Sequence, residues 1–168
     1  MESEEPTDAE RARLAKELSE KYGTAITARP VPKAGDAELR ASRIKVPEAV
    51  SAWCSSSTQE RVAYSYGAHF TERVRAFNLE FPNPPDVVAH PRNEDEVVAT
   101  LDWCNENQYV AVPYGGGSSV VWGLNPPEDR GPTVVISLGG LDQVLEVDEV
   151  SRAARIQAGV FGPHLEDQ

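Results

Sequence analysis

The spacing of apolar residues differs from one segment of the chain to the next, and the first regular spacing lies near the N-terminus. Apolar side chains recur there at every fourth position, at Leu14, Leu18 and Tyr22. Because Thr7 and Glu10 form a capping-box pattern before them, residues 7–22 are predicted to form an amphipathic helix that ends near Gly23. Residues 24–45 follow no period, so we expect an irregular connector.

The next stretch of the chain gives weaker signals. A short helix is expected over 47–53, with Pro47 in its first turn. A second capping-box pattern, Ser57-x-x-Glu60, precedes apolar positions that fit a helix or a strand equally well. His69 lacks a Cys, an Asp or a second His at metal-binding spacing, so we expect a structural role rather than that of a ligand or a general acid/base.

A cluster of prolines then interrupts the chain, at Pro82, Pro84 and Pro85. It predicts a boundary between a helical and irregular extension, 1–84, and a second domain, 85–168. This domain opens with an apolar strand at 87–90, a helix capped by Asn93, and a second strand at 109–112. A strand, helix and strand with short joints predict a βαβ unit with parallel strands.

Further apolar runs follow this unit, at 133–138, 144–148 and 153–158. We expect them to be strands of the same sheet, giving a mixed α+β sheet of about five strands. The helix after Asn93 is expected to pack on this sheet through one of two apolar faces, either Val97, Leu101 and Cys104 or Val98 and Leu101. A new helix is predicted to begin at 162–166.

The second strand runs into a stretch of unusual composition, Pro113-Tyr114-Gly115-Gly116-Gly117-Ser118-Ser119-Val120. Three consecutive glycines allow several N–H groups to point into one concave surface, and two serines add hydroxyl donors, which suits a phosphate-like anion. The carboxyl end of a strand is also where open α/β sheets bind ligands. A Rossmann fingerprint does not fit because Val120 takes the place of its third glycine, and a P-loop does not fit because no lysine follows Lys45. A glycine-rich linker or a hairpin turn is the alternative.

Composition and charge narrow the classes of partner. The chain has 168 residues and a formal net charge of -11, so it is long enough for one domain with a core and disfavours nucleic acid and anionic membranes as partners. No apolar run is long enough to span a membrane, and the acidic residues 1–5 are unlike a signal peptide, so a cytoplasmic location is expected. No metal site is expected, and Cys54 and Cys104 are expected to be separate thiols.

Three sets of residues together identify a family resemblance: the glycine loop at 113–120, the strand Val134–Leu138 with Leu141, and the run from Val147 to Glu166. The last run contains Asp148-x-x-Ser151 and Ala158-Gly159-Val160, and Tyr64-Ser65-Tyr66-Gly67 matches more loosely. From about residue 85 to 168 the chain resembles the amino-terminal FAD-binding half of the vanillyl-alcohol-oxidase-type flavoproteins. Within this group it is most similar to alkyldihydroxyacetonephosphate synthases and to glycolate or D-lactate dehydrogenases.

The resemblance implies a fold and a cofactor. The fold is α+β, the first subdomain of an FAD-binding type-4 (PCMH-like) domain, in which a βαβ unit is followed by further strands and preceded by a helical extension. The diphosphate of FAD would be wrapped by the residues of the glycine loop, Pro113, Tyr114, Gly115, Gly116, Gly117, Ser118 and Ser119. No histidine lies in this loop, so FAD is expected to be non-covalent. Trp122 departs from the family, in which glycine is common at this position.

The resemblance also implies a function, the FAD-binding portion of a flavin-dependent enzyme. The enzyme would be an alkylglycerone-phosphate synthase-like transferase or a 2-hydroxyacid oxidoreductase. Its small-molecule substrate would be bound by segments beyond Gln168, and a homodimer is left open. No catalytic residue is identified, and Tyr114 is expected to shape the loop rather than transfer protons. The alternatives are a truncated, non-catalytic fragment that keeps only the framework of the fold, or a phosphate-sugar or nucleotide-binding module without flavin.

Overall fold

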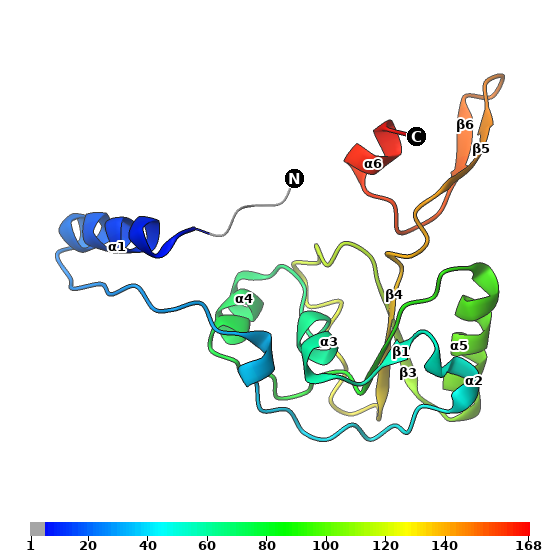
Figure 1. Ribbon diagram of the computed structural model, residues 1–168, viewed down its shortest axis with the longest axis horizontal. Helices are drawn as coiled ribbons and strands as arrows, with labels where there is room; N and C mark the ends of the chain where they lie inside the picture. The colour runs from blue at the N-terminus through cyan, green and yellow to red at the C-terminus, as the bar shows by residue number, and fades with distance from the viewer. Residues whose placement is uncertain (1–5) are drawn as a thin grey trace. The chain divides into compact units, whose positions relative to one another are not determined.

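The computed structural model describes residues 6–168 and divides the chain into two units, Met1–Pro32 and Lys33–Gln168. The acidic residues 1–5, on which the expected location partly depends, lie outside the described residues. In the first unit the predicted helix is confirmed as α1 (Asp8–Tyr22), drawn in blue in Figure 1. Thr7 and Glu10 form the expected capping box, and Gly23 ends the helix in the left-handed conformation.

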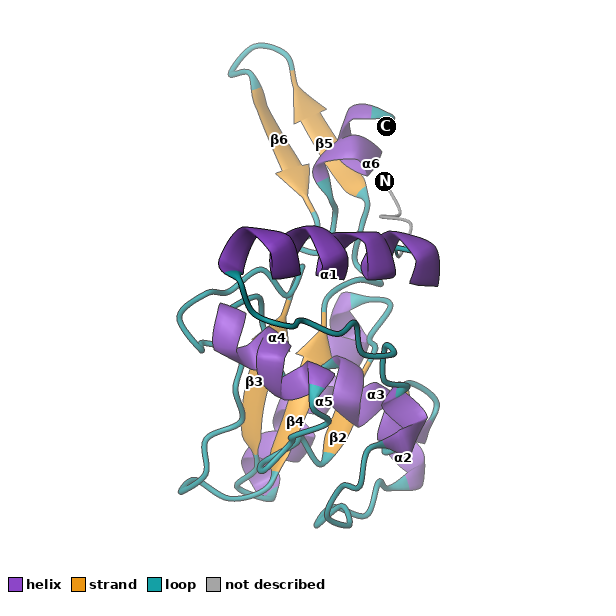
Figure 2. Ribbon diagram, turned by 90° about the vertical axis from the view of Figure 1, so that its left-hand side faces the viewer, coloured by secondary structure: helices purple, strands orange, loops and turns teal. Residues whose placement is uncertain are grey.

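The second unit is built on a four-stranded sheet with the order β1-β2-β4-β3. Its strands are β1 (Cys54–Ser55), β2 (Val87–Ala89), β3 (Val110–Tyr114) and β4 (Thr133–Ser137). The strands β2, β3 and β4 are parallel, and β1 is antiparallel to β2. The parallel βαβ unit is therefore confirmed, with α5 (Glu94–Glu106) as its helix. Figure 2 shows β4 lying between β2 and β3.

The last two strands do not join this sheet, so the expected single sheet of about five strands is wrong. β5 (Val144–Asp148) and β6 (Ala153–Ile156) form a separate antiparallel hairpin, followed by α6 (Gly162–Glu166). These two strands pair with each other rather than with the free edge of β3. They also cannot pair with β4, which is already paired along both edges and is buried along its length. A strand paired on both sides has no backbone groups left for another neighbour.

Helices flank the sheet on both sides, as Figure 1 shows, with α2 (Glu48–Ser51) and α5 on one side and α3 (Thr58–Ala63) and α4 (Phe70–Phe77) on the other. A 3-10 turn, η1 (Ala34–Asp36), lies against α3. The core includes strand residues and side chains from α2, α5 and the segment before α2, namely Ile44, Val50, Val87, Ala89, Trp103, Cys104, Val134 and Ile136. No helix among residues 6–168 has both the length and the apolar character needed to cross a membrane.

The buried face of α5 differs from both expected faces. Cys104 is buried as expected, whereas Val98 and Leu101 are 54% and 45% exposed. Thr100 and Trp103 are buried instead, and the Thr100 hydroxyl accepts a hydrogen bond of 2.9 Å from the indole N–H of Trp53. A polar residue thus helps to set the rotation of the helix because its buried hydroxyl has a hydrogen-bond partner.

The two cysteines are confirmed as free thiols, with Cys104 buried and Cys54 half-buried. Burial raises the pKa of Cys54 to about 12 and that of Cys104 to about 11. Both thiols are therefore protonated and unreactive at neutral pH.

The compact unit begins earlier than the predicted domain 85–168. Residues 33–84 supply β1, which pairs with β2, and two arginines that bind the buried carboxylate of Asp86. The prolines before Asp86 predict a domain boundary. The buried charge of Asp86 nevertheless requires partners, and because Arg40 and Arg43 provide them, the folded unit extends to residues before the prolines.

Candidate functional site

The glycine loop leaves the carboxyl end of β3 directly after Tyr114. Among residues 6–168, no backbone N–H from Gly115 to Ser119 donates a hydrogen bond, and the Ser118 hydroxyl has no partner either. A hairpin turn would pair these groups with one another. The loop instead holds a run of free donors at the edge of the parallel sheet, the feature that an anion site needs.

The side chain of Tyr114 packs against this loop at Gly117. Gly117 has φ 65°, and a Cβ atom at this position would lie 2.4 Å from the Tyr114 hydroxyl oxygen. The hydroxyl donates a hydrogen bond of 3.1 Å to the carbonyl of Tyr66. Burial raises the pKa of Tyr114, so the phenol keeps its proton at neutral pH. These contacts make Tyr114 a support for the loop rather than a base.

A second segment, Tyr64–Ala68, packs against the far end of the loop. The Ala68 N–H donates a hydrogen bond of 2.7 Å to the Ser119 carbonyl, and a Cβ atom at Gly67 would lie 2.5 Å from the same oxygen. The Tyr64 ring meets the Tyr114 ring edge-on, with centroids 4.7 Å apart. The sequence showed a loose family match here but no sign of the contact, because the two segments lie far apart along the chain.

Phe161, which sequence reasoning missed, covers the middle of the loop. A Cβ atom at Gly116 would lie 3.0 Å from its ring, whereas one at Gly115 would meet nothing within 4 Å. The loop is therefore closed beside Gly116 and open beside Gly115. An open surface with free N–H and hydroxyl donors fits the diphosphate of FAD, which presents only oxygen acceptors to such groups. Pro113 has no N–H to donate and lies exposed near the end of β3.

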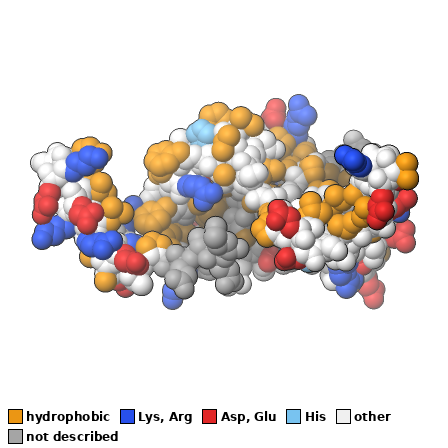
Figure 3. Space-filling view, turned by 90° about the horizontal axis from the view of Figure 1, so that it is seen from above, with side chains coloured by type: hydrophobic (Ala, Val, Ile, Leu, Met, Phe, Trp, Pro, Cys, Tyr) orange, Lys and Arg blue, Asp and Glu red, His pale blue; other side chains and the backbone are white. Residues whose placement is uncertain are grey.

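His69 and Trp122 lie next to each other beside the loop, with ring centroids 4.4 Å apart. His69 is the N-cap of α4, and its Nδ1 accepts a hydrogen bond from the Thr71 N–H, so its role is structural. Trp122 has φ 57°, a conformation that glycine adopts more easily. Phe70, Val121 and Trp122 are all exposed. Figure 3, which views the molecule from above, shows hydrophobic side chains gathered around a histidine.

Polar side chains also meet at the carboxyl ends of β2 and β4. His90 Nε2 lies 2.6 Å from a Glu60 carboxylate oxygen, and the Tyr64 hydroxyl lies 3.2 Å from the Ser137 hydroxyl. The His90 and Tyr64 rings meet edge-on at 5.4 Å. This network ties α3 to the edge of the sheet that carries the glycine loop. Glu60 thus has its partner on another element instead of completing the expected capping box, although Ser57 does cap α3.

The chain is also similar in sequence and in fold to known proteins. The family model described as FAD binding domain matches residues 85–168. The chain is 31% identical over 108 residues to alkyldihydroxyacetonephosphate synthase of Dictyostelium discoideum, covering 64% of this chain and 18% of that protein. It is 33% identical over 105 residues to glycolate oxidase subunit GlcD of Bacillus subtilis, covering 62% and 20%.

A solved structure of an alkyldihydroxyacetonephosphate synthase is also similar, with a TM-score of 0.75 and 25% identity. The match covers 83% of this chain and 27% of that one, so it includes residues before position 85. The chain spans about a fifth of the length of the curated relatives named above.

Proposed function

The chain belongs to the FAD binding domain family, and on this basis we propose that the N–H groups of Gly115–Ser119 hold the diphosphate of a non-covalent FAD. The observation that carries the proposal is the run of free donors in a loop that is open beside Gly115. Tyr114 and the segment Tyr64–Ala68 hold the loop in shape, so the donors are in place before the ligand arrives.

We propose further that the chain serves a flavin-dependent enzyme of the alkylglycerone-phosphate synthase-like or 2-hydroxyacid oxidoreductase type. The similarity to the Dictyostelium synthase and to the solved synthase structure favours the first type. Bound FAD would supply the redox chemistry. The residues of this chain bind and orient the diphosphate, and the small-molecule substrate belongs to other segments. The rival proposal is a non-catalytic chain that keeps the framework without a complete flavin site.

The proposal is tested by adding one methyl group to the open face of the loop. A Cβ atom at Gly115 meets no protein atom and the residue has no positive φ, so the loop of Gly115→Ala is expected to keep its shape. The methyl group would stand in the space of the ligand, so FAD should bind at least about tenfold more weakly, about 1.4 kcal/mol. Gly35→Ala is the matched control, because its Cβ also meets nothing within 4 Å.

Calorimetric titration of the 168-residue chain with FAD, FMN and ADP gives the readout. Tight binding of FAD with a selective loss in Gly115→Ala supports the proposal. Equal affinity in Gly115→Ala and Gly35→Ala would contradict it, and ADP binding as tightly as FAD would indicate a nucleotide module without flavin. Absence of FAD binding by a folded chain would favour the non-catalytic framework.

A further inference from the structure

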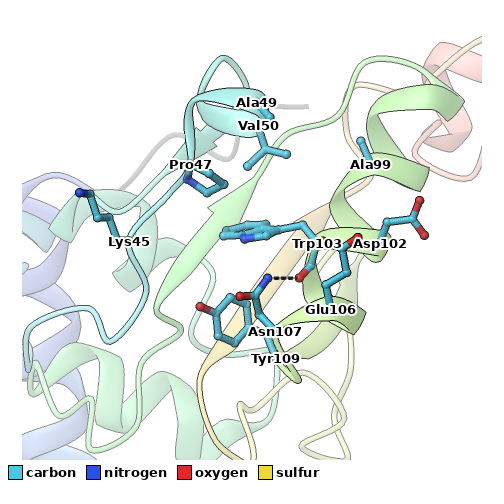
Figure 4. Close-up of a pocket in the computed structure, with 10 residues that line it drawn as sticks. All are labelled: Lys45, Pro47, Ala49, Val50, Ala99, Asp102, Trp103, Glu106, Asn107 and Tyr109. Carbon is cyan, nitrogen blue, oxygen red and sulfur yellow. Dashed lines mark hydrogen bonds between the residues drawn. The ribbon is translucent and has the colours of Figure 1, made fainter.

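A cavity of about 530 Å³ lies between α2 and α5, as the close-up in Figure 4 shows. One of its walls is Tyr109, which precedes β3, whereas the glycine loop follows β3. A strand of this length spans roughly 17 Å, so the cavity and the glycine loop are separate sites. Cavities that bind small molecules usually measure about 300–1,000 Å³. The size therefore suits a small ligand.

Aromatic and apolar side chains form the floor of this cavity. Val50 is 3% exposed and Trp103 is 8% exposed, and the Trp103 and Tyr109 rings meet edge-on at 5.7 Å. Most of the Trp103 side chain is buried, but its indole N–H has no hydrogen-bond partner among the described residues and remains within reach of solvent. A donor that solvent reaches is also free to donate to an acceptor of a ligand at this wall.

Charges of opposite sign stand at opposite sides of the floor. Figure 4 shows Lys45 on one side and Asp102 and Glu106 on the other. Within the part of the chain that the structure describes, none of these three groups forms an ion pair. The two carboxylates also lie four residues apart in the last turns of α5, where no basic residue offsets the negative end of the helix dipole. A cation is favoured on this side and an anion near Lys45.

We propose that the cavity between α2 and α5 binds a zwitterionic ligand with an apolar body, such as an amino-carboxylate. Its ammonium group lies near Asp102 and Glu106, its apolar chain covers Trp103, and its carboxylate lies near Lys45. A ligand oxygen accepts the free indole N–H. This site does not depend on the binding of FAD.

The test follows the indole N–H signals of the ¹⁵N-labelled chain while simple probes are added. The chain has three tryptophans. Trp103→Phe identifies the signal of Trp103. The probes are 6-aminohexanoate and 8-aminooctanoate, with hexylamine and hexanoate as probes of single charge. We expect an amino-carboxylate to shift the Trp103 signal saturably and to bind at least about tenfold more tightly than either single-charge probe.

Matched variants separate the cavity from general charge effects. Glu106→Gln and Lys45→Met should each weaken binding of the amino-carboxylate at least about fivefold, about 1 kcal/mol. Glu48→Gln removes one negative charge from the exposed start of α2 outside the cavity lining, and should leave binding unchanged. No shift of the Trp103 signal by any probe overturns the proposal. Equal binding of hexylamine, or equal losses in Glu48→Gln and Glu106→Gln, overturns it as well.

Discussion

Gly159 lies where the chain leaves the hairpin and passes the end of β4. Its N–H donates a hydrogen bond of 2.8 Å to the Leu141 carbonyl. A Cβ atom at Gly159 would lie 1.7 Å from the Leu138 carbonyl oxygen and 3.0 Å from that of Leu141. Both obstacles are backbone atoms, which cannot move aside like the end of a side chain. Glycine is required here by the close approach of two backbones rather than by its φ angle.

We therefore expect Gly159→Ala to lower the free energy of unfolding by about 3 kcal/mol, because overlap with backbone forces the two segments apart. Gly162→Ala is the matched control, since its Cβ meets nothing within 4 Å, and should change stability by less than about 0.5 kcal/mol. Urea unfolding followed by circular dichroism measures both. Equal stabilities of the two variants would show that the backbone around Gly159 can move to accommodate a Cβ atom at little cost.

The irregular segment before α2 is fastened to the start of β2 through one buried carboxylate. Asp86 accepts hydrogen bonds from Arg40 at 2.6 Å, from Arg43 at 2.7 Å and from the Thr133 N–H at 2.9 Å. Burial opposes ionisation of this group, but the bonds from Arg43 and Arg40 outweigh it and hold the pKa of Asp86 well below its ordinary value. Residues 33–45 of the segment predicted as an irregular connector are thus part of the folded unit.

The depressed pKa of Asp86 predicts how stability depends on pH. In the unfolded chain the carboxyl titrates near its ordinary pKa of about 3.9, so its contribution is present above about pH 4 and is lost as the pH falls further. Asp86→Asn should lower stability at pH 7 by about 2 kcal/mol, discounted because both arginines are partly exposed. It should also flatten the loss of stability between about pH 4 and pH 2. Urea midpoints across this range provide the measurement, with Asp8→Asn in α1 as the control. An unchanged slope in Asp86→Asn would assign the acid sensitivity to other carboxyls.

Helix starts and strands could be predicted because their signals are local. Thr7 and Asn93 cap their helices as expected, and the apolar runs at 87–90 and 133–138 are strands. The position of β4 between β2 and β3 could not be predicted, since pairing joins distant segments and the pattern within one strand does not name its neighbour. The same limit applies to the site. The sequence shows the glycines and serines of the loop, but it does not show that Gly67 and Phe161 contact this loop.

The unit Lys33–Gln168 contains its own core, and this core combines residues from both sides of the predicted boundary at 84/85. Ile44 and Val50 come from before the boundary and pack with Val87 and Val134 from after it. The family model begins at residue 85. A chain that began there would lack both arginines that bind Asp86 and would lack β1, the antiparallel partner of β2. Sequence similarity therefore marks a shorter segment than the one that buries the core.

Two shortened chains test which boundary supports folding. A chain of residues 33–168 retains the core cluster around Val87 and Val134 and all the groups that bind Asp86, so we expect cooperative unfolding with a midpoint close to that of the full chain. A chain of residues 85–168 leaves a buried charge without its arginines and exposes the edge of β2, so we expect no cooperative transition in urea. Cooperative unfolding of 85–168 would show that the strands after the prolines suffice. Loss of cooperativity in 33–168 would instead make residues before Lys33 a requirement for folding.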